Sequence, residues 1–288
     1  MHEPISTLRA SLPAAELVRR RSAVHVLVVT GLGLNCEAET AEAFRLVGAT
    51  PRLVHLLDVL HGEERLRFDR TQILAFAGGF AFGDHLGAGF VFANRIRWRL
   101  YDQLERFIAD GGLAIGICNG FQTMARLGIL PGLDREYRTP RATLAPNDRL
   151  GYWDCWVRLR ADPRSPCVWT HDIDLLELPS RHGEGKFLTE PGIRRRLEDE
   201  HLVAVRYVDP RGEPTEVWPH NPNGSAGAVA GVCDPTGRLF GLMPHPDAFL
   251  YAFQHPQWTR QRYTRQIADE AQGLTVFRNG VDAAAAAI

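Results

Sequence analysis

A cysteine lies where the sequence changes from one kind of local structure to another. Residues 113–117 form a short apolar run that predicts a buried strand, and residues 119–127 carry apolar side chains at helical spacing. Cys118 lies between them in the pattern GICNG, which has the form of a nucleophile elbow. The helix N-terminus favours a thiolate there, and the N–H of Asn119 points toward a forming oxyanion. We therefore predict a nucleophilic thiol, although a free cysteine is more often a small core residue.

Such a thiol needs a base, and a triad needs a third group that orients the base. His245 lies between two prolines in MPHPD, and Asp247 shares its face if the segment is extended. His182 is the rival base, with Glu184 at the same spacing, but its glycine-rich segment RHGEGKF reads better as a loop that contacts a ligand. No third ligand at a suitable spacing accompanies the His-x-Glu pair, so we predict no metal site.

A second glycine-rich loop, FAGGFAFGDHLGAG, follows a predicted strand. Gly78 and Gly79 free backbone N–H groups at the carboxyl end of that strand, where α/β proteins bind ligands. The loop is a candidate second donor for an oxyanion hole, and a simple tight turn is the alternative. The segment TGLGLNC lacks the third glycine of a dinucleotide-binding fingerprint, and the chain has no GxxxxGK[ST] loop that would bind ATP.

Strands alternate with helices through the first half of the chain. Strands are predicted at residues 24–31, 51–57 and 72–79, and helices at 36–49 and 91–112. This alternation predicts an α/β fold of the flavodoxin-like, doubly wound type, with a mostly parallel sheet and helices on both faces. Shorter β-rich segments after Trp153 predict an antiparallel β extension in the C-terminal half.

We divide the chain into an N-terminal extension (1–23), a main domain (24–265) and a C-terminal tail (266–288). One or two helical turns are expected around residues 14–21, and the final DAAAAAI is expected to be frayed.

Composition excludes several classes of protein. The 288 residues carry 33 basic and 34 acidic side chains and a net charge of −1, which argues against binding to nucleic acid or acidic lipid. Five cysteines without a CxxC pair indicate a reducing compartment rather than disulfides or a thiolate zinc site. With neither a signal peptide nor an apolar run of about 20 residues, the chain is expected to be cytoplasmic.

Together, the segments GICNGFQTM, AGGFAFGDHLGAG, RHGEGKF, NPNGS and GLMPHPD resemble a known family. The chain resembles class I (triad-type) glutamine amidotransferases, and within them the glutaminase subunits of phosphoribosylformylglycinamidine synthase in purine biosynthesis. The resemblance runs from about residue 24 to about residue 281. The cysteine elbow and the Pro-His-Pro segment are typical of the broad class, whereas the other segments point to the purine enzyme.

The resemblance implies a mechanism and its residues. Cys118 would attack the amide of glutamine, His245 would carry the proton, and Asp247 would orient His245. The implied oxyanion hole consists of backbone N–H groups at Gly79, Phe80 and Asn119, and the implied substrate-binding residues are Gly78, Gln122, His182 and Glu184. Ammonia would pass to a synthetase subunit that holds ATP and Mg, with a small accessory subunit also implied and no cofactor in this chain.

Three features depart from the family pattern. Asp247 replaces the usual glutamate, Gly87 replaces a usual arginine, and the N-terminal extension has no counterpart that we can interpret. These leave open a glutaminase that serves a different acceptor, and Asp247 by itself leaves open a non-catalytic scaffold subunit. Another cysteine hydrolase of similar fold, such as a γ-glutamyl hydrolase, is a further alternative. A hydrolase whose histidine directly follows its cysteine is disfavoured, because Asn119 occupies that place.

Overall fold

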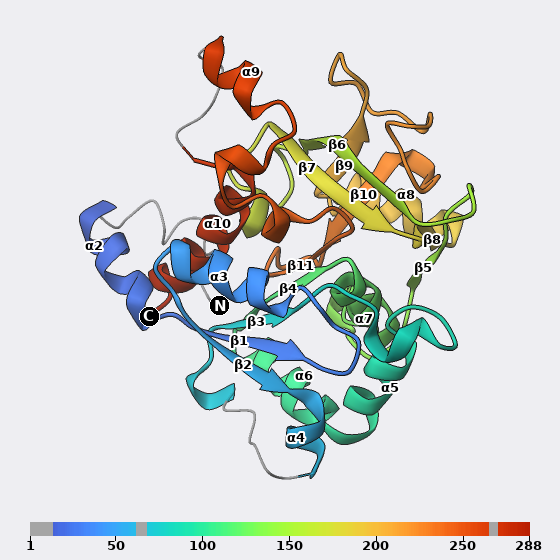
Figure 1. Cartoon of the computed structure of the whole chain (residues 1–288). Coiled ribbons are helices and arrows are strands. Elements are labelled where there is room, and N and C mark those ends of the chain that lie inside the picture. Colours follow the sequence, from blue (N-terminus) through green and yellow to red (C-terminus); the bar gives the residue numbers. More distant parts are fainter. Residues whose placement is uncertain (1–13, 62–67, 265–269) are drawn as a thin grey trace.

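The computed structural model describes residues 14–61, 68–264 and 270–288, and a nine-stranded mixed sheet forms its centre (Figure 1). Five strands pair in parallel in the spatial order β2 (Thr50–His55), β1 (His25–Thr30), β3 (Ile73–Phe76), β4 (Leu113–Ile117) and β11 (Leu239–Leu242). Antiparallel pairing continues the sheet through β10 (Val229–Cys233), β9 (Val205–Val208), β6 (Trp153–Ala161) and β7 (Leu175–His182). The predicted fold class, including its antiparallel extension, is confirmed.

A second, two-stranded sheet pairs β5 (Ala142–Pro146) with β8 (Glu184–Thr189) in antiparallel fashion. The turn from β7 to β8 carries the RHGEG segment, so β8 leaves the main sheet directly beside the end of β7. Every residue of β3, β4, β10 and β11 is buried, which explains their unbroken apolar sequences, because both faces of these central strands are covered.

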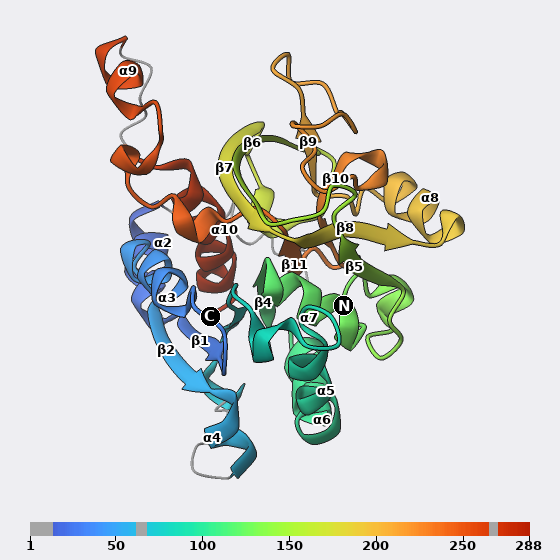
Figure 2. The same cartoon turned by 45° about the vertical axis from the view of Figure 1, so that its right-hand side comes forward.

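Helices cover both faces of the parallel part of the sheet (Figure 2). One group consists of α2 (Ala14–Arg20), α3 (Glu37–Leu46) and α10 (Gln272–Ala286), and the other of α5 (Phe90–Arg99), α6 (Tyr101–Ala109) and α7 (Asn119–Leu127). The shorter helices are α4 (Leu56–His61), α8 (Pro191–Asp199) and α9 (Trp258–Tyr263). Among the described residues, no helix is both long and apolar enough to cross a membrane.

The single helix predicted for residues 91–112 is wrong, because the chain forms two helices there. Leu100 leaves the helical range at φ −128° and ψ −1°, between α5 and α6. Leu100 nevertheless serves both helices, since its N–H donates to the Ile96 carbonyl of α5 and its carbonyl accepts from the Leu104 N–H of α6. Leu100 and Tyr101 are both buried, so the break itself packs against the core.

The frayed C-terminus predicted for residues 282–288 is also wrong, since α10 continues to Ala286 and is buried along most of its length. Asp282 receives two hydrogen bonds from the Arg21 guanidinium, at 2.7 and 3.1 Å. Gly280 packs so closely on Trp169 that an added Cβ would lie 2.1 Å from the ring. The predicted boundary at residue 265 falls within 265–269, outside the described residues, as do residues 1–13 of the predicted extension.

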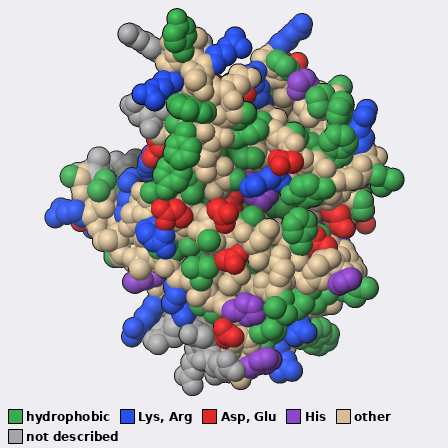
Figure 3. Space-filling view, in the orientation of Figure 1, with side chains coloured by type: hydrophobic (Ala, Val, Ile, Leu, Met, Phe, Trp, Pro, Cys, Tyr) green, Lys and Arg blue, Asp and Glu red, His purple; other side chains and the backbone are tan. Residues whose placement is uncertain are grey.

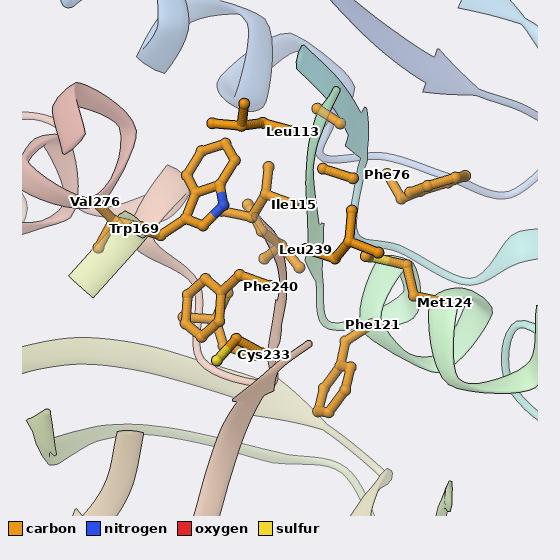
Figure 4. Packing of buried hydrophobic residues seen from close by; sticks show 14 of the residues in the cluster. Phe76, Leu113, Ile115, Phe121, Met124, Trp169, Cys233, Leu239, Phe240 and Val276 are labelled. Carbon is orange, nitrogen blue, oxygen red and sulfur yellow. The ribbon is translucent and has the colours of Figure 1, made fainter. Parts of the chain in front are cut away.

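The core is continuous from the parallel strands to α10. Figure 4 shows Trp169 with Leu113 and Ile115 of β4 and Leu239 of β11, near Val276 of α10. On the face shown in Figure 3, most basic side chains lie around the outline and do not gather into one patch, and several acidic side chains lie near the middle of the face.

Candidate active site

The predicted elbow is present, with Cys118 between the end of β4 and the start of α7. Cys118 adopts φ 52° and ψ −107°, a strained conformation for a residue with a side chain. A Cβ on Gly120 would lie 2.0 Å from the Phe76 carbonyl oxygen, and one on Gly116 would lie 2.7 Å from the Gly120 carbonyl. Both glycines of the pattern are therefore required by close backbone packing around the cysteine.

His245 and Asp247 lie together in the segment that follows β11. The carboxylate Oδ1 of Asp247 is 3.2 Å from His245 Nδ1, so the shorter acid reaches the ring without an intervening group. The His245 backbone N–H donates to the Pro179 carbonyl at 2.7 Å, which fixes the segment against β7. His245 Nε2 is buried and has no hydrogen-bond partner of ordinary geometry among the described residues. It is therefore free to accept a proton.

The charges around His245 favour its protonated form. Burial alone would lower the pKa of His245, but the Cys118 thiolate and then the Asp247 carboxylate raise it well above its usual value. His245 thus lies between two groups whose negative charges stabilise its imidazolium form.

The three predicted oxyanion donors differ in availability. Asn119 is the first residue of α7, where a backbone N–H has no acceptor within the helix. The N–H of Gly79, at φ +136°, has no acceptor among the described residues. By contrast, the N–H of Phe80 donates to the Gly33 carbonyl at 2.8 Å. Gly79 and Asn119 fit an oxyanion hole, whereas Phe80 is already engaged.

His182 lies in surroundings that do not fit its predicted contact with a ligand. Its Nδ1 lies 3.2 Å from Asn147 Oδ1, its Nε2 lies 3.0 Å from Ser180 Oγ, and the side chain is 3% exposed. Burial, and next the charge on His245, lower the pKa of His182 to about 3. With both nitrogens engaged, His182 is a neutral structural residue and does not rival His245 as the base.

The other predicted substrate-binding residues connect α7 to the glycine loop and β8. Gln122 donates from Nε2 to the Glu184 carbonyl at 2.6 Å, and Glu184 Oε2 accepts from the Ala88 N–H at 3.0 Å. Gln122 Oε1 is buried without a partner among the described residues, as is Asn119 Oδ1. Gly78 lies beside His245, where an added Cβ would be 2.9 Å from the ring.

Sequence reasoning missed three side chains at this site. Thr40 of α3 donates from Oγ1 to Asp247 Oδ2 at 3.0 Å, and both residues are buried. Cys36 precedes α3 and lies near His245. The Tyr152 ring packs against the Phe80 ring at a tilt of 42°, with 5.9 Å between ring centroids, and burial and then the charge on Cys118 raise the pKa of Tyr152. No local spacing signals them, because each reaches the site from a distant part of the chain.

The amino-acid sequence is similar to those of known proteins over most of its length. Residues 23–282 match the model of the CobB/CobQ-like glutamine amidotransferase domain. The chain belongs to this family. Phosphoribosylformylglycinamidine synthase subunit PurQ from Dehalococcoides mccartyi is 41% identical over 90% of this chain and 97% of the relative. The PurQ subunit from Archaeoglobus fulgidus is 34% identical, with 91% and 97% covered.

A solved structure agrees with these relatives. A chain of PurLQS from Thermotoga maritima superimposes with a TM-score of 0.64 at 25% identity, covering 90% of this chain and 97% of that one. This chain is therefore a glutamine amidotransferase of the PurQ type. The family membership and the enzyme class predicted from the sequence are confirmed.

Proposed function

We propose that Cys118, His245 and Asp247 hydrolyse L-glutamine in this chain, and that the ammonia is used by phosphoribosylformylglycinamidine synthase in purine biosynthesis. The observation that carries the proposal is the strained Cys118 at the start of α7, in the same buried site as the His245–Asp247 pair. The PurQ relatives support phosphoribosylformylglycinamidine synthase as the enzyme that uses the ammonia, and their similarity extends over nearly the whole of both chains.

The first half of the reaction forms a thioester. The sulfur of Cys118 bonds to the side-chain amide carbon of glutamine while His245 holds the thiol proton. The resulting oxyanion accepts from the N–H groups of Gly79 and Asn119, and one such donor is typically worth about 10²–10³ in rate. The carbon–nitrogen bond then breaks, and His245 passes its proton to the departing nitrogen, which leaves as ammonia.

The second half regenerates the thiol. His245 takes a proton from water, the hydroxide oxygen bonds to the thioester carbon, and the carbon–sulfur bond breaks to release glutamate. Asp247 keeps His245 Nδ1 protonated so that Nε2 exchanges the proton in both halves. Gln122 Oε1 and Asn119 Oδ1, both buried acceptors without partners among the described residues, are available to the substrate.

The ammonia passes to a synthetase subunit that holds ATP, Mg and formylglycinamide ribonucleotide and makes formylglycinamidine ribonucleotide. The PurLQS structure from Thermotoga maritima supports such an assembly and the place of a small accessory subunit in it. The five free cysteines of this chain are consistent with a cytoplasmic enzyme. The scaffold alternative rested on Asp247 alone, and its contact with His245 removes that support.

The test is labelling with 6-diazo-5-oxo-norleucine, a glutamine analogue that alkylates nucleophilic cysteines, followed by peptide mapping. Labelling at Cys118 that excess glutamine blocks is the expected result. The Cys118→Ala variant should lose glutamine-dependent synthesis with the synthetase but keep ammonia-dependent synthesis, and Cys155→Ser is the matched thiol control. If Cys118→Ala kept glutamine-dependent synthesis, the proposed nucleophile would be wrong.

A further inference from the structure

A second thiol lies in the active site and has no part in the mechanism above. Sulfur of Cys36, a ring nitrogen of His245 and a carboxylate oxygen of Asp247 all lie within 4.8 Å of one another. In the part of the chain that the structure describes, this is the only group of three or more such side chains at that spacing. His245 and Asp247 are buried, whereas Cys36 is partly exposed. A small ligand would therefore reach the group from the side of Cys36.

The three donors match one class of ion. A thiolate, an imidazole and a carboxylate are the ligands of zinc, with bonds of about 2.0–2.3 Å, whereas Mg²⁺ and Ca²⁺ prefer oxygen alone. Around a tetrahedral ion, donors at those bond lengths lie roughly 3.4–3.6 Å apart. His245 Nδ1 and Asp247 Oδ1 are already 3.2 Å apart, and the Cys36 sulfur lies within 4.8 Å of a donor atom on each, so the three donors are close to the separations that an ion requires.

We propose that Cys36, His245 and Asp247 form an inhibitory binding site for Zn²⁺ and similar divalent ions. The inhibitory part rests on the proposed function. An ion on Nδ1 of His245 replaces the contact with Asp247, and an ion on Nε2 occupies the atom that accepts the Cys118 proton. Either mode removes His245 from proton transfer, so bound metal and glutamine hydrolysis exclude each other.

The neighbourhood of the site keeps these donors in place. A Cβ on Gly78 would lie 2.9 Å from His245 Cε1 and 3.4 Å from Cys36 sulfur, so this glycine lets ring and thiol approach the same strand end. Thr40 Oγ1 holds Asp247 Oδ2 at 3.0 Å and leaves Oδ1 toward the ring. A hydrogen bond to a ligating carboxylate is what orients metal ligands in known sites.

The experiment uses the full chain without a histidine tag, with Co²⁺ as a spectroscopic probe and Zn²⁺ as the inhibitor. A thiolate-to-cobalt absorption band is expected in the wild type and in Cys118→Ser, and it should be lost in Cys36→Ser. Loss of even an outer partner typically weakens a metal site about 10–100-fold. Removing the Cys36 ligand should therefore raise the inhibitory Zn²⁺ concentration at least about tenfold, each variant being compared with its own zinc-free rate.

The controls keep the outcomes distinct. Cys155→Ser should bind Co²⁺ as the wild type does, and circular dichroism checks that Cys36→Ser is folded. A band that survives in Cys36→Ser but disappears in Cys118→Ser would overturn the proposal, because the metal would then bind the nucleophile itself. Equal zinc inhibition of wild type and Cys36→Ser would overturn it as well. Cobalt binding through Cys36 in a chain that hydrolyses no glutamine would refute the proposed function and leave the metal site standing.

Discussion

Two regions of this molecule each bury a histidine, at the end of β7 and after β11, and they give it opposite charge states. His182 and His245 are each 3% exposed. The neutral partners Asn147 and Ser180 surround His182, and burial lowers its pKa to about 3. At His245 the charges on Cys118 and Asp247 outweigh burial and raise the pKa. Burial alone therefore does not determine the protonation state of the two histidines, and the charge of their partners determines which of them can move a proton.

The two regions also influence each other. The charge on His245 is the second cause, after burial, that lowers the pKa of His182. When His245 beside Cys118 carries the positive charge, His182 is therefore held in its neutral form. His182 contributes packing and two hydrogen bonds, and it remains neutral throughout the physiological pH range.

The largest effect is expected when the charge is removed from the partner of His245. In Asp247→Asn the amide cannot stabilise the imidazolium and can select the wrong tautomer, a change that costs about 10⁴ in kcat in serine proteases. We expect kcat for glutamate release, measured with the synthetase present, to fall about 10³–10⁴-fold. Ammonia-dependent synthesis should be unchanged.

Asp247→Glu is the matched control, because it keeps the charge and restores the acid that is usual in the family. It should stay within about tenfold of the wild type, a difference of about 1.4 kcal/mol in the barrier. If Asp247→Asn kept wild-type activity, the contrast between the two histidines would have no bearing on catalysis.

The second prediction concerns the neutral histidine and the stability of the fold. His182 has a folded pKa of about 3, and an unfolded histidine has a pKa of about 6.5. Between these values the unfolded chain binds a proton that the folded chain does not, so the free energy of unfolding falls as pH falls from about 6.5 toward 3, by about 1.4 kcal/mol per pH unit. Above about pH 6.5 His182 has no such effect.

His182→Gln removes this titration and retains one hydrogen-bonding amide. The stability advantage of the wild type over His182→Gln should shrink by about 2 kcal/mol between pH 7 and pH 5. Urea unfolding at several pH values measures it, and comparison with the variant cancels the contribution of the other histidines. Parallel stability curves for the two proteins would mean that His182 takes up a proton in the folded state.

The sequence predicted the site where local spacing determines geometry. The GICNG pattern fixes the elbow at Cys118, and the MPHPD segment fixes the pair of His245 and Asp247, because each pattern spans only a few residues. The neutral state of His182 could not be predicted, since it depends on burial by the folded chain and on the charge of His245, which is distant in the sequence. Thr40 contacts Asp247 across 207 positions, a contact that no local pattern encodes.

The fold follows the same rule. Apolar runs and helical periodicity predicted the parallel strands and their helices, because burial on both faces leaves a direct trace in the sequence. The break at Leu100 and the buried α10 depend on tertiary contacts instead. Arg21 and Asp282 pair across 261 positions, and the alanines near Asp282 look the same in a frayed tail as in a packed helix.

The smallest effect is expected at Thr40, whose hydroxyl donates a hydrogen bond to Asp247. Thr40→Val removes the hydroxyl that donates to Asp247 Oδ2 and keeps the shape of the side chain. A hydrogen bond to a charged group is typically worth about 1.5–3 kcal/mol, but Asp247 keeps its contact with His245, so we expect the lower end, about a tenfold fall in kcat.

Because Thr40 acts through Asp247 and does not touch the substrate, KM for glutamine should stay unchanged in Thr40→Val. Thr40→Ser keeps the hydroxyl and should restore kcat. A rise in KM with unchanged kcat would show instead that Thr40 shapes the glutamine pocket and does not act on catalysis through Asp247.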